Sequence, residues 1–128
     1  MEEKNNPLSP HLQIYKWQIS SLLSITHRIV GVINTLAIIV ICFWSLSLLL
    51  GADNYQFINN FLKSLFGKFL VISLCWTFSF HILNELRHLS WDLGYGFDLR
   101  ISKITGVLAL VGSFILTILF YLIGKNIF

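Results

Sequence analysis

The segment Ile29–Leu50, with the sequence IVGVINTLAIIVICFWSLSLLL, contains 22 residues and no charged side chain. A helix that crosses the hydrocarbon core of a bilayer needs about 20 predominantly apolar residues. The apolar core of a secretory signal peptide is shorter, about 7–15 residues, and lies closer to the N-terminus. The segment therefore predicts a transmembrane helix and not a cleaved signal.

Two further segments have the same character. Ile104–Gly124 lies uncharged between two lysines and is long enough to span a bilayer by itself. Phe69–Asn84 has only 16 uncharged residues, but it reaches the required length when it is extended to Leu65 on one side and to Leu86 on the other. The sequence thus predicts three transmembrane helices.

The composition of the whole chain also indicates a membrane protein. Of its 128 residues, 55% are hydrophobic and 12% are charged, and the mean hydropathy is +0.74. Soluble domains carry roughly 25% charged residues. We predict an all-α integral membrane protein, with one membrane-anchor domain over residues 1–128. Its parts are an interfacial segment at 1–20 and helices at about 21–50, 65–89 and 103–124.

The polar segments outside these helices also indicate local structure. Pro7 and Pro10 prevent a regular helix at the N-terminus, and aromatic side chains such as Trp17 favour the level of the lipid headgroups. Tyr55–Leu65 predicts a short connection after the first helix, either helical or irregular. Ser90–Ser102 predicts a loop between the second and third helices, in which two glycines allow turns.

Basic residues near the ends of the spans predict the orientation, because cytoplasmic ends carry an excess of Lys and Arg. Six lie on the N-terminal side and three on the other: Lys4, Lys16, Arg28, Arg87, Arg100 and Lys103 against Lys63, Lys68 and Lys125. We expect the N-terminus in the cytoplasm of a bacterium, with the chain in its inner membrane, or in the matrix of a mitochondrion. The net charge of +3 then reflects orientation and needs no nucleic acid partner.

Two clusters of histidine and arginine lie at the ends of the first two spans. Ser24-Ile25-Thr26-His27-Arg28 opens the first uncharged run, and Arg87-His88, with His81 two turns earlier, closes the second. Ionisable groups within a span are costly and usually face a protein interior with a function there. Antiparallel helices would place both clusters on the same side of the membrane, so we expect them to form one site.

The position of His81 favours a haem ligand. It lies about 9 Å inside Arg87, at 1.5 Å per residue, and therefore within the hydrocarbon region. A neutral imidazole is a common axial ligand of haem iron, and guanidinium or imidazole groups nearer the surface suit the propionates. The second axial ligand would be His27 or a histidine of another subunit. The alternative is that His81 only forms a hydrogen bond between helices.

Ser24 and Arg28, one helical turn apart, could bind the oxygens of a quinone whose isoprenoid tail stays in lipid. Each residue also has a simpler interpretation. Small residues such as serine allow close helix packing, and an arginine at this position anchors the cytoplasmic end of a span.

The chain has no nucleotide-binding loop, set of metal thiolates or nucleophile paired with a base, so we expect it to be part of a larger assembly. A purely structural anchor is an alternative. A small transporter is disfavoured, because the third span offers few polar groups: Thr105, Ser113 and Thr117.

Both clusters resemble signatures of the cytochrome b subunit family of succinate dehydrogenase, the larger membrane anchor of respiratory complex II. The first signature resembles Pro7-Leu8-Ser9-Pro10-His11, Ile14-Tyr15, Ser24-Ile25-Thr26-His27-Arg28 and Gly31. The second resembles His81, Leu86-Arg87-His88 and Asp92-Leu93-Gly94. The chain departs from the family pattern at three positions, where it has Asn6, Val30 and Glu85. At the last of these the family usually has Gly or Ala.

The resemblance implies a role for each cluster. His81 would be the axial ligand of haem b, with the second ligand from the smaller anchor subunit. The propionates would lie near His27, Arg28, Arg87 and His88. Ser24 and Arg28 would line a ubiquinone site. The partners would be the flavoprotein, the iron–sulfur subunit and the smaller anchor. A fumarate reductase anchor or a haem-free relative remains an alternative within the same family.

Overall fold

The computed structural model describes residues 17–127 of the chain. This part contains the helices α1 (Ile19–Leu50), α2 (Ala52–Lys63), α3 (Leu65–Asp92) and α4 (Leu99–Ile127). Three of them, α1, α3 and α4, are long and apolar enough to cross a membrane. The predicted all-α class with three spans is therefore confirmed. Most of the predicted interfacial segment, 1–20, lies outside the described residues.

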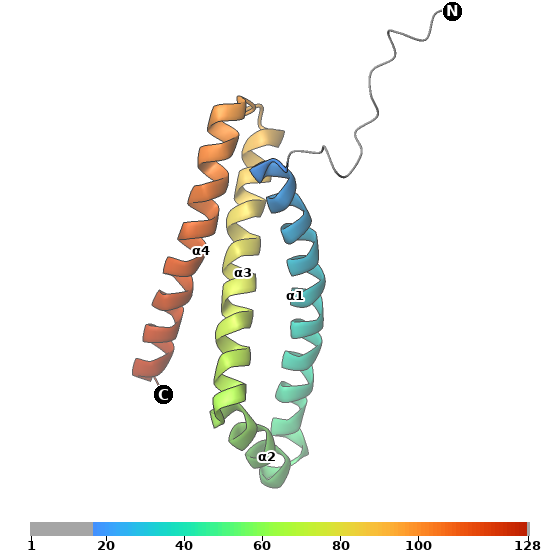
Figure 1. Cartoon of the computed structure of the whole chain (residues 1–128). Helices are drawn as coiled ribbons and strands as arrows, with labels where there is room; N and C mark the ends of the chain where they lie inside the picture. The colour runs from blue at the N-terminus through green and yellow to red at the C-terminus, as the bar shows by residue number, and fades with distance from the viewer. Residues whose placement is uncertain (1–16, 128) are drawn as a thin grey trace, which may run out of the picture.

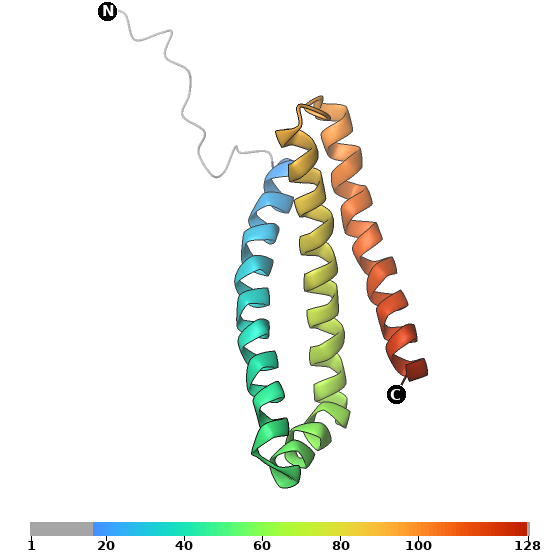
Figure 2. The same ribbon diagram turned by 180° about the vertical axis from the view of Figure 1, so that it is seen from behind.

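The three long helices run antiparallel, one after the next, and α3 lies between α1 and α4 (Figure 1). The short helix α2 joins α1 to α3 at one end of the bundle. The N-terminal end of α1 lies at the other end, beside the connection between α3 and α4, as the view from behind also shows (Figure 2). Both histidine and arginine clusters therefore belong to the same end of the molecule.

The connection between the first two spans is helical. The sequence allows either a helix or an irregular segment at Tyr55–Leu65, and α2 covers most of this range. Ser64 separates α2 from α3, and its hydroxyl accepts a hydrogen bond from the backbone N–H of Gly67 at 3.1 Å. Serine is a favoured residue at this position because it satisfies one of the unpaired N–H groups of the first turn.

The connection between α3 and α4 is shorter than the predicted loop, Ser90–Ser102. α3 continues to Asp92 and α4 already begins at Leu99. A carboxylate oxygen of Asp98 accepts a hydrogen bond from the backbone N–H of Arg100 at 3.2 Å, which stabilises the start of α4. Within the connection, Gly94 and Gly96 have φ angles of 86° and 82°, which L residues with a side chain rarely adopt.

Polar side chains join the helices inside the membrane region. The Thr77 hydroxyl on α3 donates to the Asn34 side-chain oxygen on α1 at 2.8 Å, and the Asn34 amide donates to the Thr77 carbonyl at 3.4 Å. Both residues are buried. In lipid, hydrogen bonds and small residues hold helices together where the hydrophobic effect between them is absent. A small apolar core consists of Leu23, Val30 and Phe80, with Trp76 packed against it.

Candidate functional site

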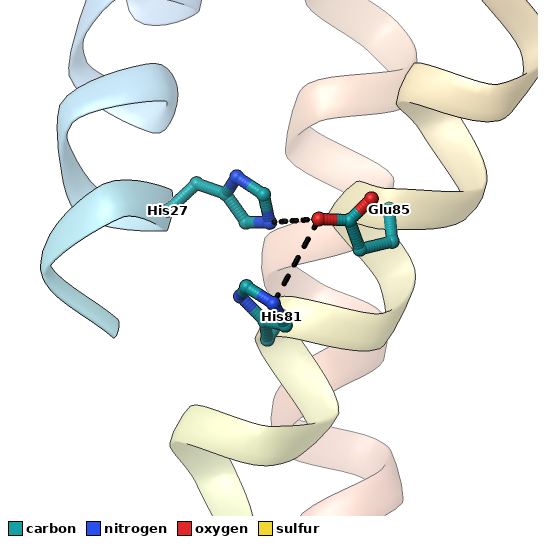
Figure 3. A group of neighbouring side chains, drawn as sticks. All are labelled: His27, His81 and Glu85. Atoms are coloured by element: carbon teal, nitrogen blue, oxygen red, sulfur yellow. Dashed lines mark ion pairs between the residues drawn. The ribbon is translucent and has the colours of Figure 1, made fainter. Parts of the chain in front are cut away.

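The imidazole rings of His27 on α1 and His81 on α3 are stacked. Their centroids are 4.4 Å apart and their planes are inclined by 17° (Figure 3). His27 lies eight residues after the start of α1 and His81 eleven residues before the end of α3. These positions are about 12 and 16 Å from the same end of the bundle, at 1.5 Å per residue. Antiparallel packing therefore brings the two histidines to a similar depth.

The carboxylate of Glu85 lies against both rings. Its Oε1 atom is 3.3 Å from Nε2 of His27 and 3.7 Å from Nε2 of His81 (Figure 3). Glu85 follows His81 by one turn of α3, so the two side chains share a face of the helix. The Glu85 side chain is 58% exposed and that of His81 is 29% exposed. The cluster is thus partly open to its surroundings.

His88 extends the cluster toward the end of the bundle. Its ring centroid is 5.3 Å from that of His27, and 5.0 Å from that of Trp91, which it meets edge to face. His27 therefore lies within ring contact of both α3 histidines. The structure brings together three of the predicted site residues, His27, His81 and His88.

Gly31 allows the close approach of α1 to His81. A Cβ atom added at Gly31 would lie 3.3 Å from Cε1 of His81, which is tighter than ordinary van der Waals contact. Gly31 is one turn beyond His27 on the same face of α1. The absence of a side chain at this position therefore leaves the room that the His81 ring occupies.

Arg87 points to a different part of the bundle. Its guanidinium donates to the carbonyl and the hydroxyl of Ser102, each at 2.9 Å, and to the Thr105 hydroxyl at 3.2 Å. It also lies 4.2 Å from the centre of the Trp91 ring, a cation–π contact. Arg87 is buried. In this structure it therefore joins α3 to α4 and does not meet the histidines.

The two predicted quinone-binding residues lie at the same end of α1 as His27. Ser24 is half-buried and Arg28 is exposed. They are one turn apart and so lie along one face of the helix. This face is next to that of His27, because consecutive residues of a helix are separated by about 100° around its axis.

Two features of this region were not foreseen from the sequence. One is the pair Ser102 and Thr105, which bind Arg87 from the first turns of α4. Their spacing of three residues, which places both on one face, is the signal that could have identified them. The other is Asn84, which is almost completely buried in α3 and whose amide has no hydrogen-bond partner within residues 17–127.

Comparison with known proteins places the chain in a family. The family described as succinate dehydrogenase/fumarate reductase transmembrane subunit matches residues 2–120. The chain is 40% identical to the succinate dehydrogenase cytochrome b556 subunit of Rickettsia felis over 120 residues, which cover 90% of each protein. It is 30% identical to the cytochrome b556 subunit of Paracoccus denitrificans over 115 residues, covering 90% of this chain and 88% of that protein.

A mitochondrial relative is also named as a cytochrome b subunit of succinate dehydrogenase. The chain is 38% identical over 112 residues to the mitochondrial succinate dehydrogenase cytochrome b560 subunit of Mus musculus, covering 84% of this chain and 64% of that protein. The family match includes both histidine clusters, the first two spans and most of the third. The chain belongs to the transmembrane subunit family of succinate dehydrogenase and fumarate reductase.

Proposed function

We propose that this chain is the haem- and quinone-binding membrane anchor of a succinate:quinone oxidoreductase. Its relatives are named as cytochrome b subunits of succinate dehydrogenase and come from bacteria and mitochondria. The observation that carries the proposal is the contact of His27 with both His81 and His88 at one end of an apolar bundle. Nothing in the topology requires three imidazoles there, and ionisable groups inside a span are rarely retained without a function.

The residues around His81 fit an axial haem ligand. His81 belongs to α3, one of the three membrane-spanning helices, and its side chain is 29% exposed. His81 would hold haem b, and the second ligand would come from the smaller anchor subunit. His27, Arg28 and His88 would be the cationic or hydrogen-bonding groups near the propionates. Arg87 could join them only by giving up its contacts with Ser102. When bound, the haem would supply one-electron redox chemistry.

Ser24 and Arg28 would contribute to the ubiquinone site. A hydroxyl and a guanidinium offer the donors that quinone carbonyl oxygens need. Arg28 is exposed in the isolated chain, so its guanidinium is available to a ligand or to another subunit. The flavoprotein and the iron–sulfur subunit would dock at this end of the bundle, and the electrons from succinate would pass through the iron–sulfur subunit to the quinone.

The quinone assignment is tested by two assays on the purified complex. In Ser24→Ala and Arg28→Ala variants, we expect quinone reduction by succinate to fall much more than the reduction of an artificial dye that accepts electrons before the membrane. Ser45→Ala, a change of the same kind at the far end of α1, is the control and should leave both rates unaltered. Equal loss of both activities in the two site variants would contradict a role in quinone binding.

A haem-free anchor is the second candidate, and one observation favours it. Glu85 places a carboxylate against Nε2 of His81, the atom that haem iron would use. The visible spectrum of the complex distinguishes the two candidates. A b-type absorption band supports the cytochrome, and a colourless membrane domain supports the haem-free alternative.

A further inference from the structure

We propose that His27, His81 and Glu85 form a binding site for a divalent transition-metal ion, with Zn²⁺ as the best fit, in the haem-free chain. Together they offer two imidazole nitrogens and one carboxylate oxygen, and these atoms all lie within 4.8 Å of one another. Two histidines and a glutamate are an established ligand set for zinc, in which a water molecule takes the fourth position.

The distances are close to those that a metal would impose. Tetrahedral zinc, with bonds of about 2.0–2.1 Å, holds its ligand atoms roughly 3.3 Å apart. The Nε2 atom of His27 is already 3.3 Å from Oε1 of Glu85, and that of His81 is 3.7 Å from it. The two stacked rings must turn so that their nitrogens point at one ion. The exposure of His81 and Glu85 leaves these two side chains room to adjust, whereas the His27 side chain is only 14% exposed.

The polar atoms of the cluster lack better partners. The Nε2 atom of His27 is buried and makes no hydrogen bond in the described part of the chain, although Oε1 of Glu85 is 3.3 Å away. Burying such an atom without a partner is energetically unfavourable. A metal bond to this nitrogen would satisfy it.

The negative charge of Glu85 is also available. Arg87, only two residues away, is held by Ser102 and Thr105 on α4. Within residues 17–127, no lysine or arginine forms an ion pair with Glu85, and its carboxylate contacts only the histidine nitrogens. A carboxylate that is not neutralised by a fixed cation strengthens the attraction of a divalent ion.

The site would compete with haem for the same side chain. This consequence rests on the proposed function, since it assumes that His81 is the haem ligand. A metal bonded to Nε2 of His81 leaves that atom unable to bind iron. The haem-free chain would therefore take up either the metal or haem, but not both.

The direct experiment is a Zn²⁺ titration of the full chain, purified without haem in detergent micelles and freed of any affinity tag. Competition with a chromophoric chelator gives the stoichiometry and the affinity. We expect one equivalent of Zn²⁺, and we expect Glu85→Gln and His27→Gln to weaken binding by at least about tenfold. Asp92→Asn removes the same charge at an exposed position of α3 and should bind as the parent does. Circular dichroism checks that each variant keeps its helices.

Retention of the parent affinity in both site variants, or no binding by the parent chain, would overturn the metal site. A haem titration in the presence of saturating Zn²⁺ then separates the two proposals. Blocked haem uptake in the parent chain, relieved in Glu85→Gln, supports competition at His81. Haem uptake that zinc leaves unaffected, in a chain that binds zinc at the cluster, would leave the metal site in place and contradict His81 as the haem ligand.

Discussion

His27 and His81 come from different helices, yet their rings are stacked with centroids 4.4 Å apart. The contact depends on the antiparallel arrangement of α1 and α3 and on the absence of a side chain at Gly31. The same interface contains the buried pair Asn34 and Thr77, which lie deeper in the bundle, about two turns from His27 and one turn from His81. Packing between α1 and α3 therefore determines the geometry of the site, and the first prediction concerns that packing.

Thr77→Val should destabilise the bundle by about 1 kcal/mol. The substitution keeps the shape of the side chain but removes the hydroxyl that donates to Asn34, and interhelical hydrogen bonds in membranes are worth about this much. The measurement is the free energy of unfolding in mixed micelles, followed by circular dichroism. Thr35→Val is the control, because the Thr35 hydroxyl bonds only to the Gly31 carbonyl of its own helix. Equal stability of the two variants would contradict an energetic role for the pair.

Arg87→Ala should loosen the attachment of α4. The buried guanidinium donates three hydrogen bonds to Ser102 and Thr105, and hydrogen bonds of charged groups contribute about 1.5–3 kcal/mol. We expect faster amide hydrogen exchange in the first turns of α4 and a loss of unfolding free energy of about 3 kcal/mol. Arg100→Ala removes an exposed guanidinium from the same end and should change neither quantity. Unaltered exchange in Arg87→Ala would show that α4 is held by other contacts.

Gly31→Val should reduce the haem content of the assembled complex. A Cβ atom at Gly31 already comes within 3.3 Å of the His81 ring, so the two methyl groups of valine must displace that ring or separate α1 from α3. The measurement is the ratio of haem to protein in the purified complex. Gly124→Val is the matched control, because a Cβ atom at Gly124 meets nothing within 4 Å. Full haem content in Gly31→Val would show that haem binding does not depend on the present position of the His81 ring.

The sequence predicted the fold because the hydropathy of three segments leaves few alternatives. The uncharged runs at Ile29–Leu50 and Ile104–Gly124 are long enough to define spans by length alone. The apolar runs do not define where the helices begin and end. α4 begins at Leu99 and not near residue 103, since Asp98 stabilises a first turn that lies outside the apolar run. Local hydrogen bonding, and not hydrophobicity, determines where this helix starts.

The site was predictable only in part. The spacing of His81 and Glu85 by four residues places both on one face of a helix, and antiparallel spans bring His27 to the same depth. The contact of Glu85 with both histidines depends on how closely two helices approach and on side-chain rotamers, which spacing does not specify.

The orientation of the Arg87 side chain is a second feature that residue spacing does not specify. Arg87 and His88 are adjacent in the sequence, but consecutive residues lie about 100° apart around a helix. One therefore faces α4 and the other faces α1. Which of the two meets the cluster depends on the rotation of α3 between its neighbours, and the sequence does not give that rotation.

The visible spectrum of the purified complex with His81→Leu tests the central claim most directly. The account predicts that the subunits still assemble and that the b-type absorption of the parent complex is lost, because leucine has no atom that can bind iron. His88→Leu, at the outer edge of the same cluster, should retain the band in altered form. A b-type spectrum in His81→Leu that is identical to that of the parent complex would contradict the assignment of this histidine as the haem ligand.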